Sequence, residues 1–215
     1  MSQKSALIFW GGWEGHEPQA CAARVEQILT DEGFAVRCEQ GTGILGSDDL
    51  GRYDLIVPLA TQTQIEKQPL QNLIAAVEAG TGLGGFHGGM GDTFRAEPAY
   101  QFMVGGQWVA HPGNMMDYRV QITRPDDPVM AGIGDFDYHS EQYYLHVDPG
   151  IEVLATTTFS GEHAPWTKGV VMPVVWKHRY GAARVFYSAL GHDAAEFDHP
   201  QMQLILRRGL VWAAR

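Results

Sequence analysis

The sequence predicts an α/β fold of three layers, in which a mostly parallel β-sheet carries helices on both faces. Two observations favour this class. Short apolar runs alternate with amphipathic segments of helical length through the first half of the chain, a pattern typical of parallel sheets. Of the 215 residues, 45% are hydrophobic and 19% are charged, as in an ordinary folded domain. No linker or repeat divides the chain, so we expect a single domain over residues 1–215.

The first half supplies the parallel part of the sheet. Its strands are predicted from four short apolar runs: 6–10, 34–39, 54–60 and 82–86. A glycine pair ends the first run, and Pro18 then opens a helix whose apolar residues recur until Gly33. A second helix is predicted over 65–80, ending at Gly80. These elements alternate as a parallel sheet requires.

The second half predicts strands with few helices between them: 117–123, 151–158, 173–179 and 183–191. Tyr180-Gly181, between the last two runs, indicates a hairpin and hence an antiparallel portion at one side of the sheet. Pro200 opens a final amphipathic helix, which should dock Leu204, Ile205 and Trp212 against the sheet.

Charge and composition limit the partners and the compartment. A formal net charge of −10 would repel nucleic acid and anionic membrane surfaces, so we expect neither as a partner. No apolar run reaches the ~18 residues that span a bilayer, and the N-terminus does not resemble a signal peptide. Cys21 and Cys38 are too few for a disulfide framework. We therefore expect a cytoplasmic protein that binds a small molecule. The sequence leaves open whether it forms a homo-oligomer.

Three of the nine histidines follow strand candidates. His16 lies in the loop after the first strand, while His87 and His192 directly follow the runs 82–86 and 183–191. Ligands of open parallel sheets bind beyond the carboxyl ends of the strands. The three imidazoles are therefore expected to line one pocket.

His87 stands within Gly85-Phe86-His87-Gly88-Gly89, which has the form G-x-H-x-G. This form matches the strand-to-turn elbow of α/β enzymes, with histidine in place of a nucleophilic serine or cysteine. Small neighbours are needed because the central residue of an elbow occupies a strained turn. The alternative is a glycine-rich turn whose histidine only bonds the backbone.

A family resemblance is found in short stretches spread over nearly the whole chain: WGGWEGHEP, GGFHGG, VGGQWVAHP, SEQYY, PVVW, GAARVFYSALGHD and LRRGLVWAA. In this order they resemble the ThuA-like family of trehalose-utilisation proteins. The resemblance implies a class I glutamine amidotransferase-like fold, which is a flavodoxin-like arrangement. It also implies that His87 replaces the cysteine nucleophile of the amidotransferases and that His192 matches their activating histidine. Cys21 falls on an apolar helix side and Cys38 in a strand, so thioester chemistry on glutamine is excluded.

Glu141 is the candidate carboxylate of the site. His139, Glu141 and Tyr143 are spaced by two, so they face the same way if the segment is extended. Glu141 also matches the family's acidic-then-tyrosine motif. It can act as a general base, ligate a metal or orient a histidine; the alternative is a solvated strand face.

The candidate substrate-binding residues surround these groups. Trp13 and Tyr143 can stack on sugar faces, although aromatic residues also pack cores. His111, in VGGQWVAHP, either contacts the ligand or caps its loop, and Gly88 completes the set. A divalent metal such as zinc would suit His16, His87 and His192 together with Glu141, but no HExxH or other compact ligand spacing occurs.

The resemblance implies carbohydrate catabolism through 3-keto sugars. A ketone at C3 acidifies the C2 proton, so a base can remove it and expel the C1 substituent without a protein nucleophile. We therefore expect an enzyme that acts on a 3-keto-glycoside or related oxidised sugar by elimination or hydrolysis. Glu141 or His87 would be the base, His192 an acid or enolate stabiliser, and His16 would complete the cluster. Two alternatives are a non-catalytic sugar-binding or regulatory module and a metal-dependent hydrolase.

Overall fold

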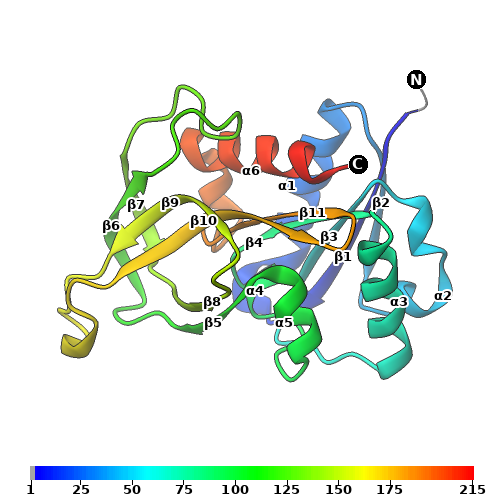
Figure 1. Cartoon of the computed structure of the whole chain (residues 1–215), viewed down its shortest axis with the longest axis horizontal. Coiled ribbons are helices and arrows are strands. Elements are labelled where there is room, and N and C mark those ends of the chain that lie inside the picture. The colour runs from blue at the N-terminus through cyan, green and yellow to red at the C-terminus, as the bar shows by residue number, and fades with distance from the viewer. Residues whose placement is uncertain (1–2) are drawn as a thin grey trace.

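The computed structural model describes residues 3–215 and places nine strands in one mixed sheet (Figure 1). The sheet order is β2-β1-β3-β4-β11-β10-β9-β6-β7. Its parallel part consists of β1 (Ser5–Gly12), β2 (Ala35–Gln40), β3 (Leu55–Thr61), β4 (Gly82–Phe86) and β11 (Ala183–Ser188). The carboxyl ends of these strands consequently share one edge of the sheet.

The rest of the sheet is antiparallel. Its strands are β10 (Val171–Tyr180), β9 (Glu152–Thr158), β6 (Met115–Ile122) and β7 (Phe136–Glu141). The predicted hairpin joins β10 to β11 at Tyr180. All eight predicted strands are present, with bounds shifted by a few residues. Strand β7 was missed, as was a separate antiparallel pair formed by β5 (Gly106–Ala110) and β8 (Tyr144–Val147).

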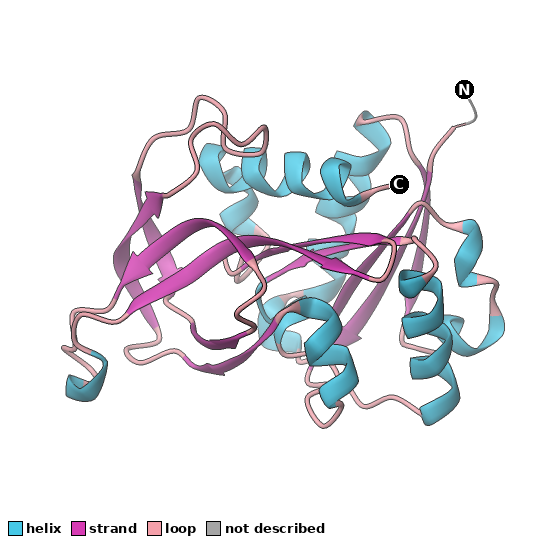
Figure 2. Cartoon of the chain, viewed as in Figure 1, coloured by secondary structure: helices cyan, strands magenta, loops and turns pink. Residues whose placement is uncertain are grey.

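Helices cover both faces of the sheet (Figure 2). One face carries α1 (Pro18–Asp31) and α6 (Pro200–Ala213), and the other carries α2 (Ile44–Ser47), α3 (Lys67–Glu78) and α5 (Pro98–Val104). The five-residue α4 (His87–Gly91) directly follows β4. Four short 3-10 turns complete the described elements: Glu14–His16, Leu50–Arg52, Pro165–Thr167 and Ala195–Asp198.

The burial pattern explains why these residues form these elements. Every residue of β3 and of β4 is buried, as expected for parallel strands covered on both faces. Helix α6 begins at Pro200, where a proline costs no helical hydrogen bond. Its buried stripe includes Ile205 and Leu210, whereas Leu204 and Trp212 are only half-buried. The predicted docking of these side chains is confirmed, because Leu204 and Trp212 pack against the core from the border of the stripe.

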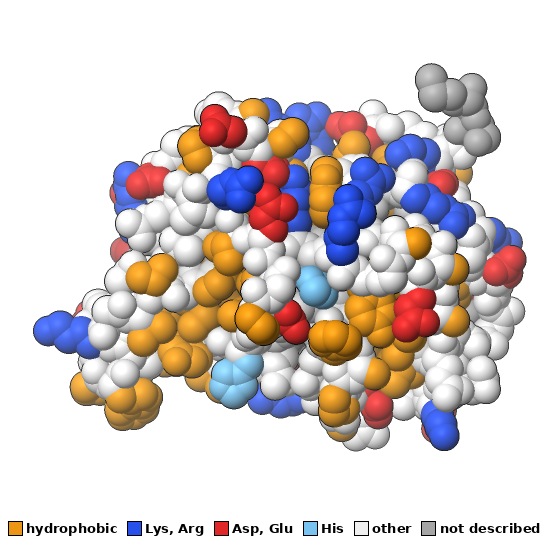
Figure 3. Space-filling model, in the orientation of Figure 1, with side chains coloured by type: hydrophobic (Ala, Val, Ile, Leu, Met, Phe, Trp, Pro, Cys, Tyr) orange, Lys and Arg blue, Asp and Glu red, His pale blue; other side chains and the backbone are white. Residues whose placement is uncertain are grey.

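The surface differs between the two ends of the sheet (Figure 3). On the face shown, basic and acidic side chains are interspersed around α6, whereas hydrophobic side chains spread over the β-rich end. Trp166 and Val171 of that end are 84% and 60% exposed. None of the helices described between residues 3 and 215 combines the length and the apolarity needed to cross a bilayer.

Candidate active site

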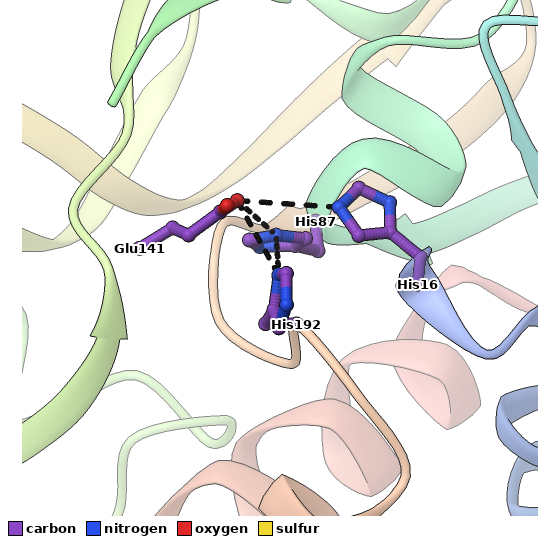
Figure 4. Close-up of side chains that lie close together, drawn as sticks. All are labelled: His16, His87, Glu141 and His192. Atoms are coloured by element: carbon purple, nitrogen blue, oxygen red, sulfur yellow. Dashed lines mark hydrogen bonds and ion pairs between the residues drawn. The ribbon is translucent and has the colours of Figure 1, made fainter. Parts of the chain in front are cut away.

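Four polar side chains from separate segments meet beyond the carboxyl ends of the parallel strands (Figure 4). His16 follows β1, His87 follows β4 and His192 follows β11. Glu141, the last residue of β7, reaches them from the opposite end of the sheet. One nitrogen or oxygen of each residue lies within 4.8 Å of the corresponding atoms of the other three. The structure thus brings together the histidines and the carboxylate that the sequence singled out.

His87 occupies the join between β4 and α4 in a left-handed backbone conformation, with φ of +46°. This strained turn is the one the G-x-H-x-G form predicts. The ring is 1% exposed, and its Nδ1 lies 2.9 Å from the carbonyl oxygen of Ala189. Its Nε2 lies 3.2 Å from Glu141 Oε2. The Tyr187 hydroxyl donates to the His87 carbonyl at 3.0 Å, so both the ring and the backbone of His87 are fixed.

Gly88 allows His16 to approach the elbow. A Cβ at position 88 would lie 2.4 Å from His16 Cε1 and 3.1 Å from the Tyr143 hydroxyl oxygen. His16 Nδ1 is hydrogen-bonded to the hydroxyl of Thr61, the last residue of β3, at 2.8 Å. Its Nε2 therefore points toward Glu141, at 4.0 Å from Oε2. Gly88 acts here through its small size.

His192 is held by its own loop. The backbone N–H groups of Gly191 and His192 donate to Glu196 Oε2 at 3.1 and 2.9 Å. The Tyr138 hydroxyl donates to the same oxygen at 2.5 Å. With its backbone fixed, His192 places Nδ1 3.3 Å from His87 Nε2 and 3.4 Å from Glu141 Oε2.

Glu141 directs its two oxygens to different neighbours. Oε2 faces the three histidines, whereas Oε1 lies 3.7 Å from Nε2 of His111, beyond hydrogen-bond distance. His139, two residues earlier on the same strand, lies outside the site: its side chain is 62% exposed and pairs with Asp117, while that of Glu141 is 7% exposed. Strand β7 pairs regularly with β6 through both residues, so the two side chains differ because the histidine cluster covers Glu141, while His139 faces solvent.

The protonation states of these groups follow from burial and from one another. Burial lowers the pKa of His87 to about 4, although the hydrogen bond with Glu141 acts in the opposite direction. Burial also tends to raise the pKa of Glu141, but the surrounding imidazoles outweigh it and hold that pKa well below its usual range. Burial tends to lower the pKa of His192, yet the contact with Glu141 raises it overall. An ionised carboxylate therefore lies beside a neutral His87 and a more basic His192.

The aromatic residues surround the cluster at different depths. Trp13 is 48% exposed, and its ring meets His16 edge to face with centroids 4.7 Å apart. His111 is partly open, with its side chain 27% exposed. Tyr143 is 4% exposed and stacks on His87 at 4.1 Å between ring centroids. Trp13 and His111 are thus accessible to a ligand, while Tyr143 supports the His87 ring from beneath.

Sequence reasoning missed the residues that position the cluster. Thr61 bonds the His16 ring, and Tyr187 and Glu196 bond the backbone of His87 and His192. Tyr138 in turn bonds Glu196. The end of a buried parallel strand was a usable signal for Thr61, because that strand end shares the sheet edge with the histidines. No spacing in the sequence relates Tyr138 or Glu196 to His192.

Neither cysteine has the low thiol pKa that a nucleophile needs. Burial raises the pKa of Cys21 to about 12 and that of Cys38 to about 11. Both thiols are therefore protonated near neutral pH and are poor nucleophiles.

A family model described as ThuA, trehalose utilisation, matches residues 5–213. The chain belongs to the ThuA family. This membership confirms the resemblance seen in the motifs and gives the chain a carbohydrate-related role. Among curated proteins, none matches it in sequence.

Solved structures show the same ThuA fold. A protein described as ThuA-like from Bacteroides uniformis is 20% identical, with a TM-score of 0.81 over 98% of this chain and 91% of its own. A second, from Parabacteroides merdae, is 20% identical, with a TM-score of 0.79 over 99% and 90%. A β-galactosidase from Bacillus circulans matches 98% of this chain with 30% of its own, at 15% identity and a TM-score of 0.57. At these identities the likenesses establish the fold alone.

Proposed function

We propose that this ThuA-family chain is an enzyme that removes the C2 proton of a 3-keto-glycoside and thereby expels the C1 substituent. The observation that carries the proposal is the arrangement of Glu141. Its Oε2 is engaged by the three histidines, whereas its Oε1 makes no hydrogen bond within residues 3–215. Oε1 therefore keeps free lone pairs on the side of the partly exposed His111, where a substrate can enter.

The proposed reaction needs a base but no nucleophile. Glu141 Oε1 accepts the proton from C2, and the C–H electron pair forms an enolate whose charge lies on the C3 oxygen. Collapse of the enolate breaks the C1–O bond, and the leaving alkoxide takes up a proton. The products are an alcohol and a 1,2-unsaturated 3-keto sugar; addition of water across the new double bond completes a net hydrolysis.

The Glu141 carboxylate is a weak base for this task, because the pKa of the carboxyl group is lowered. Stabilisation of the enolate must therefore provide much of the driving force. His192 supports this requirement, since its contact with Glu141 raises its pKa and favours an imidazolium. His87 is buried to 1% exposure and holds Glu141, so we assign the base to Glu141 and a positioning role to His87.

Trp13 supports a sugar as the substrate. Its half-exposed ring borders His16 at the mouth of the cluster, where it can stack against the apolar face of a pyranose. The family description, trehalose utilisation, is the independent argument for a carbohydrate.

The proposal is tested with 3-keto-trehalose and simple 3-keto-glucosides, followed by NMR in D₂O. Wild-type protein should release the C1 substituent and exchange the C2 proton for deuterium. Glu141→Gln should lower both rates by at least ~100-fold, because it replaces the base by an amide of the same shape. His139→Gln, on the exposed part of the same strand, should leave them unchanged. Absence of turnover and exchange with every 3-keto substrate, with and without added divalent metal, would refute the proposal.

A second function, that of a metal-dependent hydrolase, is favoured by the grouping of four ligand-type side chains. It predicts cleavage of ester or amide substrates by metal-loaded protein without exchange at C2. A non-catalytic sugar-binding module instead predicts sugar binding that His87→Ala and His192→Ala leave intact.

A further inference from the structure

The hydrogen bonds around His87 leave two acceptor atoms facing each other with no donor between them. The carbonyl oxygen of Ala189 can only accept, so His87 Nδ1 must carry the hydrogen of that 2.9 Å bond. In a neutral ring Nε2 then presents a lone pair, and it faces Glu141 Oε2, which also carries only lone pairs, at 3.2 Å. Two facing acceptors at this distance need an electropositive particle between them or beside them.

Protonation of one of the imidazoles would satisfy these two acceptor atoms poorly. Protonating His87 would place an imidazolium at a site of 1% exposure, with the rings of His16 and His192 at 4.8 and 5.3 Å between centroids. A hydrogen on His192 Nδ1 can serve His87 Nε2 or Glu141 Oε2, at 3.3 and 3.4 Å, but not both fully. His16 Nε2, at 4.0 Å from Oε2, is too distant for a hydrogen bond.

The same distances suit a metal ion. Bonds of about 2.0–2.1 Å to nitrogen and oxygen in a tetrahedral site place the ligand atoms about 3.3–3.4 Å apart. The three atoms His87 Nε2, Glu141 Oε2 and His192 Nδ1 are separated by 3.2, 3.3 and 3.4 Å. They therefore already form one face of such a tetrahedron, whereas His16 Nε2, at 4.0 Å from Oε2 and within 4.8 Å of the other ligand atoms, must move inward by roughly 1 Å.

The outer contacts are also those of metal-binding histidines. Such residues commonly hydrogen-bond through the ring nitrogen that does not face the ion, which fixes the ring orientation. His87 does so through Nδ1 to the Ala189 carbonyl, and His16 through Nδ1 to the Thr61 hydroxyl. Glu196 fixes the backbone of His192. The His16 and His87 rings are thus oriented by contacts outside the cluster.

We propose that His16 Nε2, His87 Nε2, Glu141 Oε2 and His192 Nδ1 bind one divalent transition-metal ion, with Zn²⁺ the best match to this ligand set. Three imidazoles and one carboxylate favour zinc-like ions over Mg²⁺ or Ca²⁺, which prefer oxygen ligands. The inference uses the same side chains as the proposed function. If the ion is bound during that reaction, it would supply positive charge near the enolate oxygen. In the absence of the ion, an imidazolium of His192 would supply that charge.

The test measures metal binding directly, on full-length protein freed of any affinity tag and stripped with a chelator. Titration calorimetry with Zn²⁺, and metal analysis after dialysis, should give one ion per chain. Glu141→Gln and His192→Asn should each weaken binding by at least ~100-fold, the upper end of the loss seen when only outer contacts are removed. His139→Gln keeps the histidine cluster intact and should bind as wild type does. Circular dichroism establishes that each variant is folded.

Each outcome decides the inference. Failure of the wild type to bind Zn²⁺, Co²⁺, Ni²⁺ or Mn²⁺ near one equivalent would overturn it, as would binding that folded Glu141→Gln and His192→Asn retain in full. Turnover of a 3-keto-glucoside by a wild type that binds none of these ions would overturn the inference and leave the proposed function standing. One tightly bound ion without any turnover would support the metal site and refute the proposed reaction on 3-keto sugars.

Discussion

Replacing Gly88 by alanine tests the packing that holds the cluster together. The new Cβ would lie 2.4 Å from His16 Cε1 and 2.9 Å from His16 Nδ1, whereas carbon atoms normally approach to about 3.5–4.0 Å. Gly88 has no left-handed φ, so the effect is steric alone. To relieve the contact, the His16 ring must shift by about 1 Å, which breaks its 2.8 Å hydrogen bond to Thr61.

The cost follows from these two losses. Overpacking a buried site costs about 1–3 kcal/mol and a lost hydrogen bond about 1 kcal/mol, so the free energy of unfolding should fall by about 3 kcal/mol. In a domain of this length that corresponds to a decrease in Tm of roughly 6–12 °C. Urea unfolding and calorimetry of metal-free protein measure both quantities. Gly43→Ala is the matched control, because Gly43 has helical dihedral angles and open space around its Cβ position.

A double-mutant cycle with His16→Ala isolates the contact. Once the imidazole is removed, the Cβ at position 88 has room, so Gly88→Ala should cost less than about 1 kcal/mol in the His16→Ala background. Equal losses in the two backgrounds would show that the elbow does not depend on the approach of His16 to Gly88, and the geometry described above would be refuted.

Three further predictions concern protonation, thiols and the His192 loop. Because burial lowers the pKa of His87 from 6.5 to about 4, the unfolded chain binds a proton between these two pH values and the folded chain does not. Stability of metal-free protein should therefore fall by up to about 3 kcal/mol as pH drops from 6.5 to 4, and a folded His87→Gln variant should lose much of this slope in urea titrations. Cys21, whose pKa burial raises to about 12, should resist iodoacetamide at pH 8 as judged by mass spectrometry, and ready alkylation of folded protein would contradict its burial. Tyr138→Phe removes the hydroxyl that donates to Glu196 and should lower the free energy of unfolding by about 1 kcal/mol; an unchanged urea midpoint would show that this bond contributes nothing.

The sheet and the histidine positions could be predicted because they depend on local patterns. Apolar runs followed by glycine or polar residues indicated the parallel strands, and chain order then placed His16, His87 and His192 at one edge. Glu141 was found only through its motif, since its strand lies at the opposite end of the sheet. No sequence spacing indicated that the histidine cluster would cover Glu141 while His139, on the same strand, stays in solvent.

Short elements and positioning contacts were beyond sequence reasoning. Helices α2, α4 and α5 are 4, 5 and 7 residues long, too short to show a helical period. The bond from Tyr138 to Glu196 joins residues 58 positions apart. Such a contact exists only once the antiparallel strands have folded back over the His192 loop.

The burial of His87 in the elbow argues against a role as a nucleophile. A nucleophile must present its reacting atom to the substrate, but the His87 ring is 1% exposed; its Nδ1 bonds the Ala189 carbonyl and its Nε2 faces Glu141 Oε2 at 3.2 Å. An imidazole reaches farther from the backbone than a thiol, and this length lets Nε2 contact a carboxylate that arrives from β7. In the proposed reaction, the elbow would orient Glu141 and leave the reacting role to Oε1, on the far side of that carboxylate. If the proposed reaction is right, His87→Ala should lose the proton-transfer activity through displacement of Glu141, and added imidazole should restore part of it. Full activity of folded His87→Ala without imidazole would refute the positioning role of His87.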